Sequence, residues 1–536
     1  MTKIAVFIAL LFGIVRILSA DTIPGGDVSG IWFADSSPYY ITGNITVQAT
    51  DTLTIEPGVI VDFLGSFYYL TVNGLLKAVG TDTDSIFFTA DTGWMGLYFN
   101  SAPDTSRLEY CVLEKALSVV LSPVFCLSSN PIISHCLMRN NTATSEGGAI
   151  TLYASTAEIS YCDIIENTGA FGGGIRCSGG STPNISHSTI SGNSVGAGIS
   201  SGGIRIDGGS HPVIDSCIIS GNTAVRGGGI AILDWSSCTI IDCIIDSNTA
   251  PGGQYAHGGG IYVMSSGGSL TINGSTISHC ISGDDGGGIC IQSAASVSAT
   301  RCILDANRAG DLGGAIYSAD CSDLLIDHCN VMRGSALAIS GIILDGATAL
   351  TVTNCIFRNQ DDLDIYFFTY TSASVSYSDF YDWGGSGGPF GGNVPAGLGV
   401  LVQTNYNGDS CDVYYNIFMD PLFEDFPNGN YHLTAGSPCI DAGDPTYQYD
   451  PDSTITDMGA YWYDQTGVAE YPVVKHRNQC DFLGATIFKG PVQLPEGQTC
   501  KVFDITGRVL IPQHIKPGIY FIEVDGRVTQ KVIKVR

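Results

Sequence analysis

The stretch CIISGNTAVRGGGIAI, Cys217 to Ile232, contains the two signatures that decide the fold. Its glycines, Gly227 to Gly229, lead into an apolar segment. Glycine-rich turns can cradle a phosphate, because their backbone N–H groups approach an anion closely. The same run can also form a structural corner without any ligand, and the rest of the chain distinguishes the two interpretations.

The glycine run is one element of an internal repeat. It recurs before seven isoleucines, at intervals of 25 to 31 residues: Ile150, Ile175, Ile204, Ile230, Ile261, Ile289 and Ile316. A second column keeps the same period: Cys111, Cys136, Cys162, Ser188, Cys217, Cys243, Ser275, Cys302, Cys329 and Cys355. An asparagine follows many of these positions five residues later: Asn141, Asn167, Asn193, Asn222, Asn248 and Asn307. Fixed periods of this length are typical of solenoids.

The repeat predicts an all-β solenoid. Apolar and polar residues alternate around both signatures, which is the period of a β-strand. No repeat could bury its apolar face alone, whereas stacking strand on like strand, about 4.8 Å apart, closes a continuous core. Parallel crossover connections are overwhelmingly right-handed. We therefore expect a right-handed parallel β-helix in which each repeat forms one rung, meaning one complete turn of the solenoid.

Each column then has a physical role. Stacked asparagines can hydrogen-bond one another as a ladder and tolerate left-handed backbone. Stacked glycines permit the positive φ of a sharp corner. Stacked cysteines are expected inside as small buried side chains with free thiols, although disulfides between neighbouring rungs are an alternative. Outside this column, Cys411 with Cys439 and Cys480 with Cys500 are candidates for disulfides.

The repeats resemble those of right-handed β-helix surface proteins, including the chlamydial polymorphic outer-membrane proteins with their GGA[ILV] and FxxN tetrapeptides. The nearest FxxN match is IFRN, Ile356 to Asn359. Ser37 to Phe63 resembles the entry rungs of bacterial β-helices, and Tyr431 to Pro445 with Met458 to Tyr461 resembles a closing segment. Such folds host many functions, so this resemblance implies architecture and not activity.

The C-terminal segment has a different character. Lys501 to Leu510 and Lys516 to Arg536 alternate as strands around two turns, and they resemble the C-terminal sorting domains of proteins exported by the type IX secretion system of Bacteroidetes-like bacteria. That resemblance implies recognition by the secretion machinery through residues 500–536. A plain structural β-sandwich is the alternative.

These features predict the organisation of the chain. We expect a signal peptide at 1–20, a β-helix at 21–463 and a C-terminal β-sandwich at 464–536. Within the β-helix we expect entry rungs at 21–110, regular rungs at 111–360, and irregular rungs with a closing segment at 361–463.

Composition limits the partners. The formal net charge is −28, and such an acidic chain would repel nucleic acid and anionic lipid. Lys3 followed by the apolar run from Ile4 to Val15 is typical of a secretory signal peptide, with a short anchor helix as the alternative. That run is shorter than the ~20 residues needed to span a bilayer. We expect export to the cell surface or medium, with no transmembrane segment after cleavage.

Candidate site residues lie on the outward face beside the glycine corners. The residue after each GGxI isoleucine is Thr151, Arg176, Arg205, Ala231, Tyr262, Cys290 or Tyr317. A stripe of Arg176, Arg205, Tyr262 and Tyr317 could bind an acidic glycan by charge-assisted hydrogen bonds and ring stacking. An ordinary solvated sheet face is the alternative.

Acidic residues offer two further candidates. Asp361, Asp362 and Asp364 could supply part of a calcium site, with a charged turn as the alternative. Asp284 and Asp285 resemble the paired acids of polygalacturonase-type glycosidases, but the partner signatures of that family are absent. We therefore expect a solvated or calcium-binding turn there.

Two matches that resemble catalytic motifs have structural explanations. The Asp-His pair in IDHC, Ile326 to Cys329, resembles a pectate lyase signature, yet it occupies the cysteine column of the repeat. His257 falls in a long insertion between rungs, without the nucleophile elbow of a hydrolase. We predict a secreted or surface protein that binds a polysaccharide or cell-surface glycan. The alternative is a calcium-assisted polysaccharide lyase or hydrolase.

Overall fold

The computed structural model describes residues 20–465, apart from residue 66, residues 196–200 and residues 385–387, together with five strands between residues 486 and 534. The chain divides into two compact units, residues 1–465 and 466–536, against a predicted boundary between 463 and 464. The predicted signal peptide lies, except for Ala20, outside the described residues. In the described part of the chain, no helix has the length and apolar character needed to cross a bilayer.

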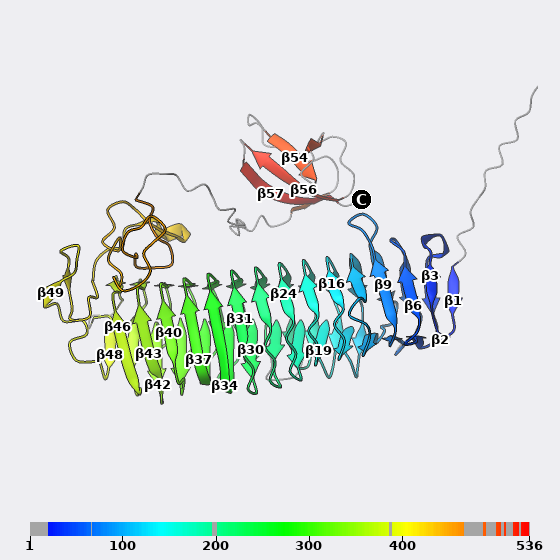
Figure 1. The fold of residues 1–536 in the computed structure, drawn as a ribbon, viewed down its shortest axis with the longest axis horizontal. Helices are drawn as coiled ribbons and strands as arrows, with labels where there is room; N and C mark the ends of the chain where they lie inside the picture. Colours follow the sequence, from blue (N-terminus) through cyan, green and yellow to red (C-terminus); the bar gives the residue numbers. More distant parts are fainter. Residues whose placement is uncertain are drawn as a thin grey trace, which may run out of the picture. The chain divides into compact units, whose positions relative to one another are not determined.

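The first unit is a parallel β-helix whose strands stack side by side along one axis (Figure 1). One face is a 15-stranded parallel sheet that carries the segment after each cysteine. Its strands are β1 (Asp21–Ile23), β4 (Tyr39–Ile41), β7 (Ile60–Phe63), β10 (Ile86–Ala90), β13 (Cys111–Glu114), β17 (Leu137–Arg139), β21 (Asp163–Ile165), β25 (Thr189–Ser191), β29 (Ile218–Ser220), β32 (Ile244–Asp246), β35 (Thr276–Ser278), β38 (Ile303–Asp305), β41 (Asn330–Met332), β44 (Ile356–Arg358) and β47 (Asp379–Tyr381). We call this face the cysteine sheet.

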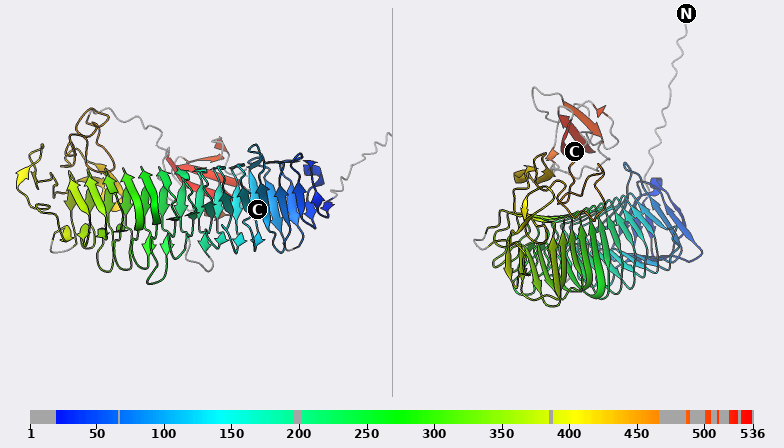
Figure 2. Two further views of the ribbon diagram at one scale, coloured as in Figure 1. Left: turned by 60° about the horizontal axis from the view of Figure 1, so that its bottom comes forward. Right: turned by 60° about the vertical axis from the view of Figure 1, so that its left-hand side comes forward.

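The other strands form two parallel rows, seen from two further directions in Figure 2. The glycine row, which follows each glycine corner, contains β2 (Gly26–Asp27), β5 (Ile45–Val47), β8 (Tyr69–Val72), β11 (Gly96–Asn100), β15 (Val124–Leu127), β19 (Ile150–Tyr153), β23 (Ile175–Ser178), β27 (Ile204–Ile206), β30 (Ile230–Leu233), β39 (Ile316–Ala319), β42 (Ile342–Asp345), β45 (Ile365–Phe367) and β48 (Phe390–Gly392). The next row contains β3 (Gly30–Trp32), β6 (Thr52–Ile55), β9 (Leu75–Val79), β12 (Arg107–Glu109), β16 (Ile132–Ser134), β20 (Glu158–Ser160), β24 (Asn184–Ser186), β28 (Val213–Asp215), β31 (Cys238–Ile241), β40 (Leu324–Asp327), β43 (Ala349–Thr353) and β46 (Ser372–Ser376). Two long strands, β34 (Ile261–Asn273) and β37 (Ile289–Thr300), pass through both rows and join them into one sheet.

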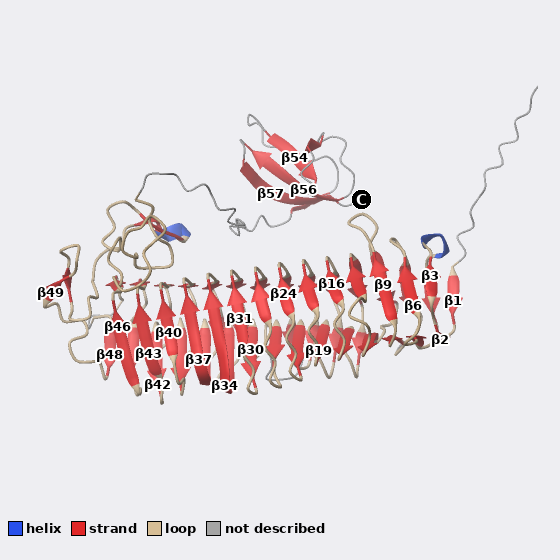
Figure 3. Cartoon of the chain, in the orientation of Figure 1, coloured by secondary structure: helices blue, strands red, loops and turns tan. Residues whose placement is uncertain are grey.

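Strands account for nearly all the regular structure (Figure 3). Short strands at the corners form two small parallel sheets. One contains β14 (Leu117–Ser118), β18 (Thr142–Ala143), β22 (Thr168–Gly169) and β26 (Ser194–Val195), and the other contains β33 (Thr249–Ala250) and β36 (Ile281–Ser282). The helices of the described residues are two 3-10 turns, η1 (Ala34–Ser36) and η2 (Phe426–Asn428).

The repeat columns stack in register, as predicted for a parallel β-helix. Ile204 pairs with Ile175 on one side and with Ile230 on the other. All three side chains are fully buried, and they belong to one core that runs from Val28 to Leu398. Because side chains alternate across a strand, every second residue of each strand enters this core.

The asparagine ladder forms as predicted. The backbone N and Nδ2 of Asn167 both donate to Asn193 Oδ1 at 3.0 Å. Asn193 repeats this pattern toward Asn222 at 2.9 and 3.1 Å. The left-handed backbone falls on the residue before the asparagine, as in Asn140 with φ 54° and Glu166 with φ 55°. The asparagine side chain can therefore point inward and bond its neighbour.

The three glycines of the corner are required for two different reasons, a positive φ at the first and close backbone approach at the other two. Gly227 has φ 62°, as predicted for a corner. Gly228 and Gly229 do not have positive φ, but a Cβ on Gly228 would lie 2.5 Å from Gly259 O, and one on Gly229 would lie 2.7 Å from Gly260 O. The second and third glycines are required because the backbones of stacked rungs approach one another too closely for a side chain.

The cysteines of the first unit are free thiols, and thirteen of them lie in the interior core. All sixteen cysteines of the first unit from Cys111 to Cys439 are buried and unbonded. Their thiols donate to backbone carbonyls, for example Cys136 Sγ to Leu108 O at 3.2 Å. The predicted Cys411–Cys439 disulfide is wrong: both thiols are free, and Cys439 Sγ instead contacts Asp379 Oδ2 at 3.5 Å. Cys480 lies outside the described residues.

The closing segment packs against the outward side of the cysteine sheet at its last rungs. Met458, Leu433 and Cys439 share a buried cluster with Ile303 and Ile356. Three short strands precede this segment, β49 (Gln403–Thr404), β50 (Ser410–Cys411) and β51 (Phe423–Asp425), and β52 (Asn430–Leu433) begins it. Within the region predicted to hold irregular rungs, β45, β46, β47 and β48 still pair with the preceding rungs.

The second unit contains a five-stranded sheet in the order β53-β57-β56-β54-β55. The strands are β53 (Thr486–Phe488), β54 (Cys500–Asp504), β55 (Val509–Leu510), β56 (Gly518–Val524) and β57 (Arg527–Lys534). The alternation seen in residues 501–510 and 516–536 thus corresponds to strands, and a second sheet of a sandwich is not among the described residues.

Candidate functional site

The predicted binding stripe lies on the outward side of the glycine row and is partly covered, with Arg176, Arg205 and Tyr317 half-buried. Tyr262 and Cys290 are fully buried, and they form a small apolar cluster with Ala231 and Leu233, against which Tyr317 packs. Residues just before the glycine corners cover parts of the stripe: Phe171 lies against Arg176, and Arg226 lies against Tyr262. This face is therefore more covered than the sequence suggested, while Arg176, Arg205 and Tyr317 keep part of their surface exposed.

Arg176 and Arg205 are neighbours on β23 and β27 and engage the protein's own acids. Arg176 Nη1 donates to Glu146 Oε2 at 2.7 Å, and its Nε donates to Asp207 Oδ2 at 3.2 Å. Arg205 also contacts Asp207. Burial raises the pKa of Asp207, but hydrogen bonds from Arg205 and other groups outweigh it and hold that pKa below its usual value.

A phenylalanine ring covers this ion-pair cluster. Phe171 lies 4.6 Å from the Arg176 guanidinium carbon and 5.4 Å from that of Arg205. These ion pairs link neighbouring rungs, so both arginines stabilise the stack. Their role in ligand binding stays a prediction.

Tyr262 and Tyr317 lie farther along the same row. Tyr262 Oη donates to Gln292 Oε1 at 2.6 Å, and its ring lies 5.6 Å from the guanidinium carbon of Arg226 and 6.2 Å from the ring of His257. Tyr317 is half-buried and its hydroxyl donates to Asp345 Oδ2 at 3.2 Å. Tyr262 thus lies under a polar cluster that the stripe did not include.

That cluster lines a pocket of about 620 Å³. Its lining residues are Arg226, Gln254, Tyr255, His257, Asp284, Asp285, Gln292 and Asp311. Arg226, His257 and Asp285 each come directly before a glycine corner in three successive rungs, and Arg226 pairs with His257 in a parallel bridge. The repeat therefore brings together residues that are about one period apart in sequence. We call this the corner pocket.

An imidazole and two carboxylates converge in the corner pocket. His257 Nδ1 lies 3.8 Å from Asp284 Oδ2 and 3.8 Å from Asp285 Oδ2. One atom from each of the three side chains lies within 4.8 Å of the others. Backbone amides position the acids, with Tyr255 N donating to Asp284 Oδ2 at 2.9 Å and Leu312 N donating to Asp285 Oδ1 at 3.3 Å.

The electrostatics of the corner pocket follow from burial and from neighbouring charge. Burial and the adjacent Asp284 raise the pKa of Asp285 to about 7. Burial lowers the pKa of His257, and the nearby Arg226 adds to this effect while Asp284 opposes it. The imidazole is therefore neutral near pH 7, with its Nδ1 buried and without a hydrogen-bond partner. Such a cluster can bind a cation or donate and accept hydrogen bonds with a polar ligand.

The predicted calcium ligands at Asp361, Asp362 and Asp364 are not presented together. Asp361 is exposed and Asp362 is half-buried, whereas Asp364 is fully buried. Among the described residues, these three carboxylates do not form a ligand cluster, while His257, Asp284 and Asp285 do. Calcium binding at this turn stays a prediction.

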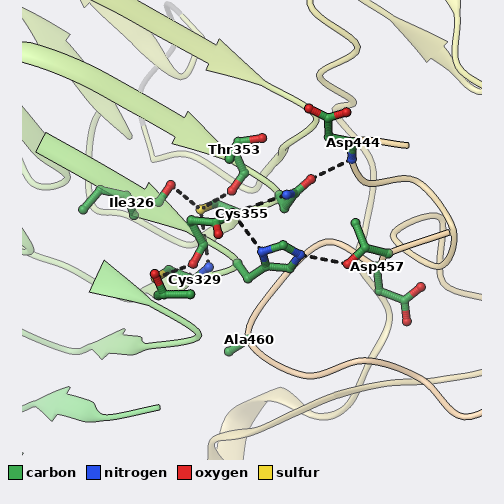
Figure 4. A network of polar contacts seen from close by, with 12 residues as sticks. Ile326, Cys329, Thr353, Cys355, Asp444, Asp457 and Ala460 are labelled. Atoms are coloured by element: carbon green, nitrogen blue, oxygen red, sulfur yellow. Dashed lines mark hydrogen bonds and ion pairs between the residues drawn. The ribbon is translucent and has the colours of Figure 1, made fainter. Parts of the chain in front are cut away.

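The Asp-His pair in the IDHC stretch has a structural setting. His328 Nδ1 lies 2.8 Å from Asp327 Oδ1, and its Nε2 lies 2.8 Å from Thr456 Oγ1 of the closing segment. Figure 4 shows the surrounding network, in which the thiols of Cys329 and Cys355 lie among backbone carbonyls near the closing segment. Both ring nitrogens have partners, so this pair anchors the closing segment to the β-helix.

A stacked aromatic column and the corner pocket are two features that the sequence did not predict. Tyr110, His135, Tyr161 and His187 stack face to face with ring centroids 4.5 to 5.0 Å apart. They come directly before the cysteine column, which was the available signal. In the same way, aligning the residue before each glycine run would have placed Arg226, His257 and Asp285 together.

One comparison with known proteins confirms the predicted right-handed β-helix. A family model described as "Right handed beta helix region" matches residues 94–202 and 197–276. Among solved structures, the chain is similar to one titled "Crystal structure of pectate lyase Pel9A", with 13% identity over 76% of this chain and 89% of that chain and a TM-score of 0.30. No curated protein matches the chain. The family match covers repeats of the β-helix and indicates no activity. The residues of the corner pocket are therefore the basis for any proposal about function.

Proposed function

We propose that the protein binds a glycan in the corner pocket. The observation that carries this proposal is the polar lining of a pocket of about 620 Å³, a size that is ordinary for small-ligand sites. Arg226, Gln254 and Gln292 supply donors, and Asp311 supplies acceptors, so the hydroxyl groups of a sugar would find both kinds of partner. Tyr255 is 57% exposed at this site, and its ring can pack against the apolar face of a sugar.

The charge of the pocket favours a neutral glycan. Asp284, Asp285 and Asp311 face one cationic side chain, Arg226. A polyuronate would meet repulsion from these acids, whereas uncharged hydroxyl groups form hydrogen bonds with them. This refines the expected ligand class from acidic to neutral sugars, and it moves the expected contact from Arg176 and Arg205 to the neighbouring pocket.

The test is a glycan-array screen of the full chain followed by calorimetry with neutral and uronate oligosaccharides. We expect binding of a neutral glycan, and we expect Tyr255→Ala to weaken it about tenfold, the effect of losing about 1.4 kcal/mol of ring contact. Tyr449→Ala is the matched control, because Tyr449 is also 57% exposed. Equal losses for both variants, or no binding of any neutral glycan, would contradict the proposal.

A polysaccharide lyase or hydrolase is the second candidate. The observation that favours it is the adjacent carboxyl pair, Asp284 and Asp285, which lines the same pocket as Arg226. Such groups can serve as acid and base toward a glycosidic bond or a sugar C–H bond. The assay is formation of unsaturated uronates or reducing ends from a polysaccharide panel, with and without calcium. Turnover that is abolished by Asp285→Asn would favour this candidate over simple binding.

We also propose that the protein acts outside the cell. The acidic composition, the apolar N-terminal run and the alternating strands of residues 500–536 support export through a signal peptide and a type IX-like route. Deletion of residues 500–536 is expected to retain the chain in the periplasm, as cell fractionation would measure. Release of the truncated chain at the wild-type level would count against a sorting role.

A further inference from the structure

We propose that His257, Asp284 and Asp285 form a binding site for a first-row divalent transition-metal ion, of the zinc class, at the base of the corner pocket. This proposal does not depend on glycan binding. It rests on the spacing of three ligand atoms, on the unsatisfied state of the imidazole and on the chemistry of the donor set.

The spacing suits an ion held between the three side chains. At 3.8 Å, His257 Nδ1 is too far from either carboxylate oxygen for a hydrogen bond. Zinc takes imidazole nitrogen and carboxylate oxygen at about 2.0–2.2 Å, which places two tetrahedral ligands about 3.4 Å apart. The two histidine–carboxylate separations require a closure of only a few tenths of an ångström around such an ion, and the ligand atoms of all three side chains lie within 4.8 Å of one another.

The side chain of His257 is buried, and one of its ring nitrogens lacks a hydrogen-bond partner. The His257 residue is 5% exposed, and its Nδ1 has no hydrogen-bond partner in the part of the chain that the structure describes. A buried polar nitrogen without a partner costs free energy. This nitrogen points toward the two acids, and a cation between them would satisfy all three groups together.

The donor set selects the kind of ion. One imidazole nitrogen with two carboxylates suits zinc, cobalt, manganese or ferrous iron, whereas calcium takes six to eight oxygens. Asp311 and Arg226 line the same pocket, so the acids still outnumber the guanidinium there. The ion's remaining coordination positions face the corner pocket, where water or a ligand oxygen can occupy them.

The sequence builds this site through one long interval. The glycine corners at Ile230 and Ile261 are 31 residues apart, the longest spacing in the series. The extra residues form the segment that carries Tyr255 and His257 over the glycine row. The backbone N–H of Tyr255 donates a hydrogen bond to Asp284 Oδ2. A bound ion would fix this segment to the next rung and so set the shape of the pocket wall.

The test uses the full-length protein, stripped of metal with a chelator and titrated separately with zinc, cobalt and calcium ions by calorimetry. We expect one zinc ion per chain, micromolar or tighter, with calcium at least tenfold weaker. We expect cobalt to give visible absorption bands characteristic of a site with a nitrogen ligand. Asp284→Asn/Asp285→Asn should weaken zinc binding at least a hundredfold. The matched control is Asp361→Asn/Asp362→Asn, which changes another adjacent acid pair and should bind zinc as the wild type does.

The outcomes separate the site from adventitious binding and from the glycan proposal. Absence of stoichiometric zinc binding by the wild type would overturn the proposal, as would equal loss in both double variants or a preference for calcium. His257→Gln provides a second variant if the double substitution unfolds the chain, and unaltered cobalt spectra from it would also overturn the proposal. Glycan binding is measured both with zinc and in chelator. No glycan binding under either condition contradicts the glycan proposal alone, and absence of zinc binding contradicts the metal proposal alone.

Discussion

The Asp364 carboxyl is fully buried, and neither of its oxygens has a hydrogen-bond partner. Burial, with a further contribution from Asp379, raises its pKa well above the usual 3.8. The side chain precedes Ile365 at the position that glycine or alanine occupies in earlier rungs. A carboxyl there is therefore accommodated in its neutral form.

The pH dependence of stability follows from this raised pKa. Above about pH 4 the unfolded chain has lost the Asp364 proton, while the folded chain keeps it, so the native state binds more protons. Stability contributed by this group is therefore present below the unfolded pKa and is lost as pH rises toward the folded pKa. We expect Asp364→Asn, which cannot ionise, to stabilise the protein at pH 7.5 by at least about 1 kcal/mol, the value of one pKa unit.

Urea unfolding of Asp364→Asn at pH 4.5 and pH 7.5 measures this effect. The gain over the wild type should shrink at the lower pH, because pH 4.5 lies only slightly above the unfolded pKa, so keeping the proton in the folded state then costs little free energy. Asp361→Asn is the control, since Asp361 is exposed three residues away and should change stability little. A gain that is the same at both pH values would contradict the assignment to Asp364.

At the scale of the element, the glycines of a corner have different roles: Gly227 supplies the positive φ, and Gly228 allows the backbones of two rungs to approach closely. Gly228 has no positive φ, yet an added Cβ would lie 2.5 Å from Gly259 O and 2.6 Å from Thr249 N. These are backbone atoms of the next rung and cannot rotate away. We expect Gly228→Ala to lower the free energy of unfolding by about 1–3 kcal/mol, as overpacking of an interior does.

Chemical denaturation of Gly228→Ala and Gly253→Ala tests this interpretation. Gly253 lies in the inserted segment, with nothing within 4 Å of an added Cβ and no positive φ, so its substitution should be neutral within about 0.5 kcal/mol. Comparable destabilisation by both would mean that the corner glycines serve flexibility and not the stacking distance.

Periodic elements could be predicted from the sequence because each column repeats one physical requirement. The core isoleucines, the asparagine ladder and the free buried thiols follow from position within the repeat, and the structure places them accordingly. The outward face of the glycine row could not be predicted. Tyr262 alternates outward in the strand, but His257 and Arg226 cover it, and the path of their variable segments leaves no periodic signal.

At the scale of the whole molecule, the register of the stack could be predicted from the sequence, whereas the candidate site could not. The corner pocket joins segments from successive rungs, so its existence depends on the register of the stack as well as on its residues. The repeat fixes the register through pairs such as Ile230 with Ile261 and Ile261 with Ile289. Asp284, Asp285 and His257 are each unremarkable in a linear scan, and stacking makes them a cluster.

The continuous core also governs the chemistry of the thiols along the entire β-helix. The sixteen free cysteines are all buried, and burial raises the pKa of thiols such as Cys280, to about 12. Since the thiolate is the reactive form, a thiol inside a closed rung is protected both by exclusion of the reagent and by retention of its proton. Local opening at the ends of a solenoid exposes few of them.

We therefore expect the non-reduced protein to react slowly with a disulfide reagent such as DTNB while folded, and to release most of these sixteen thiols when guanidinium unfolds it. Labelling followed by peptide mass spectrometry should show that thiols in the central rungs, such as Cys217 and Cys243, react at the rate of global unfolding. Reduction before unfolding provides the control for total thiols. A thiol count that stays low on unfolding without reductant would show that the columns are cross-linked, and rapid labelling of Cys217 in the folded state would show that the rungs open independently.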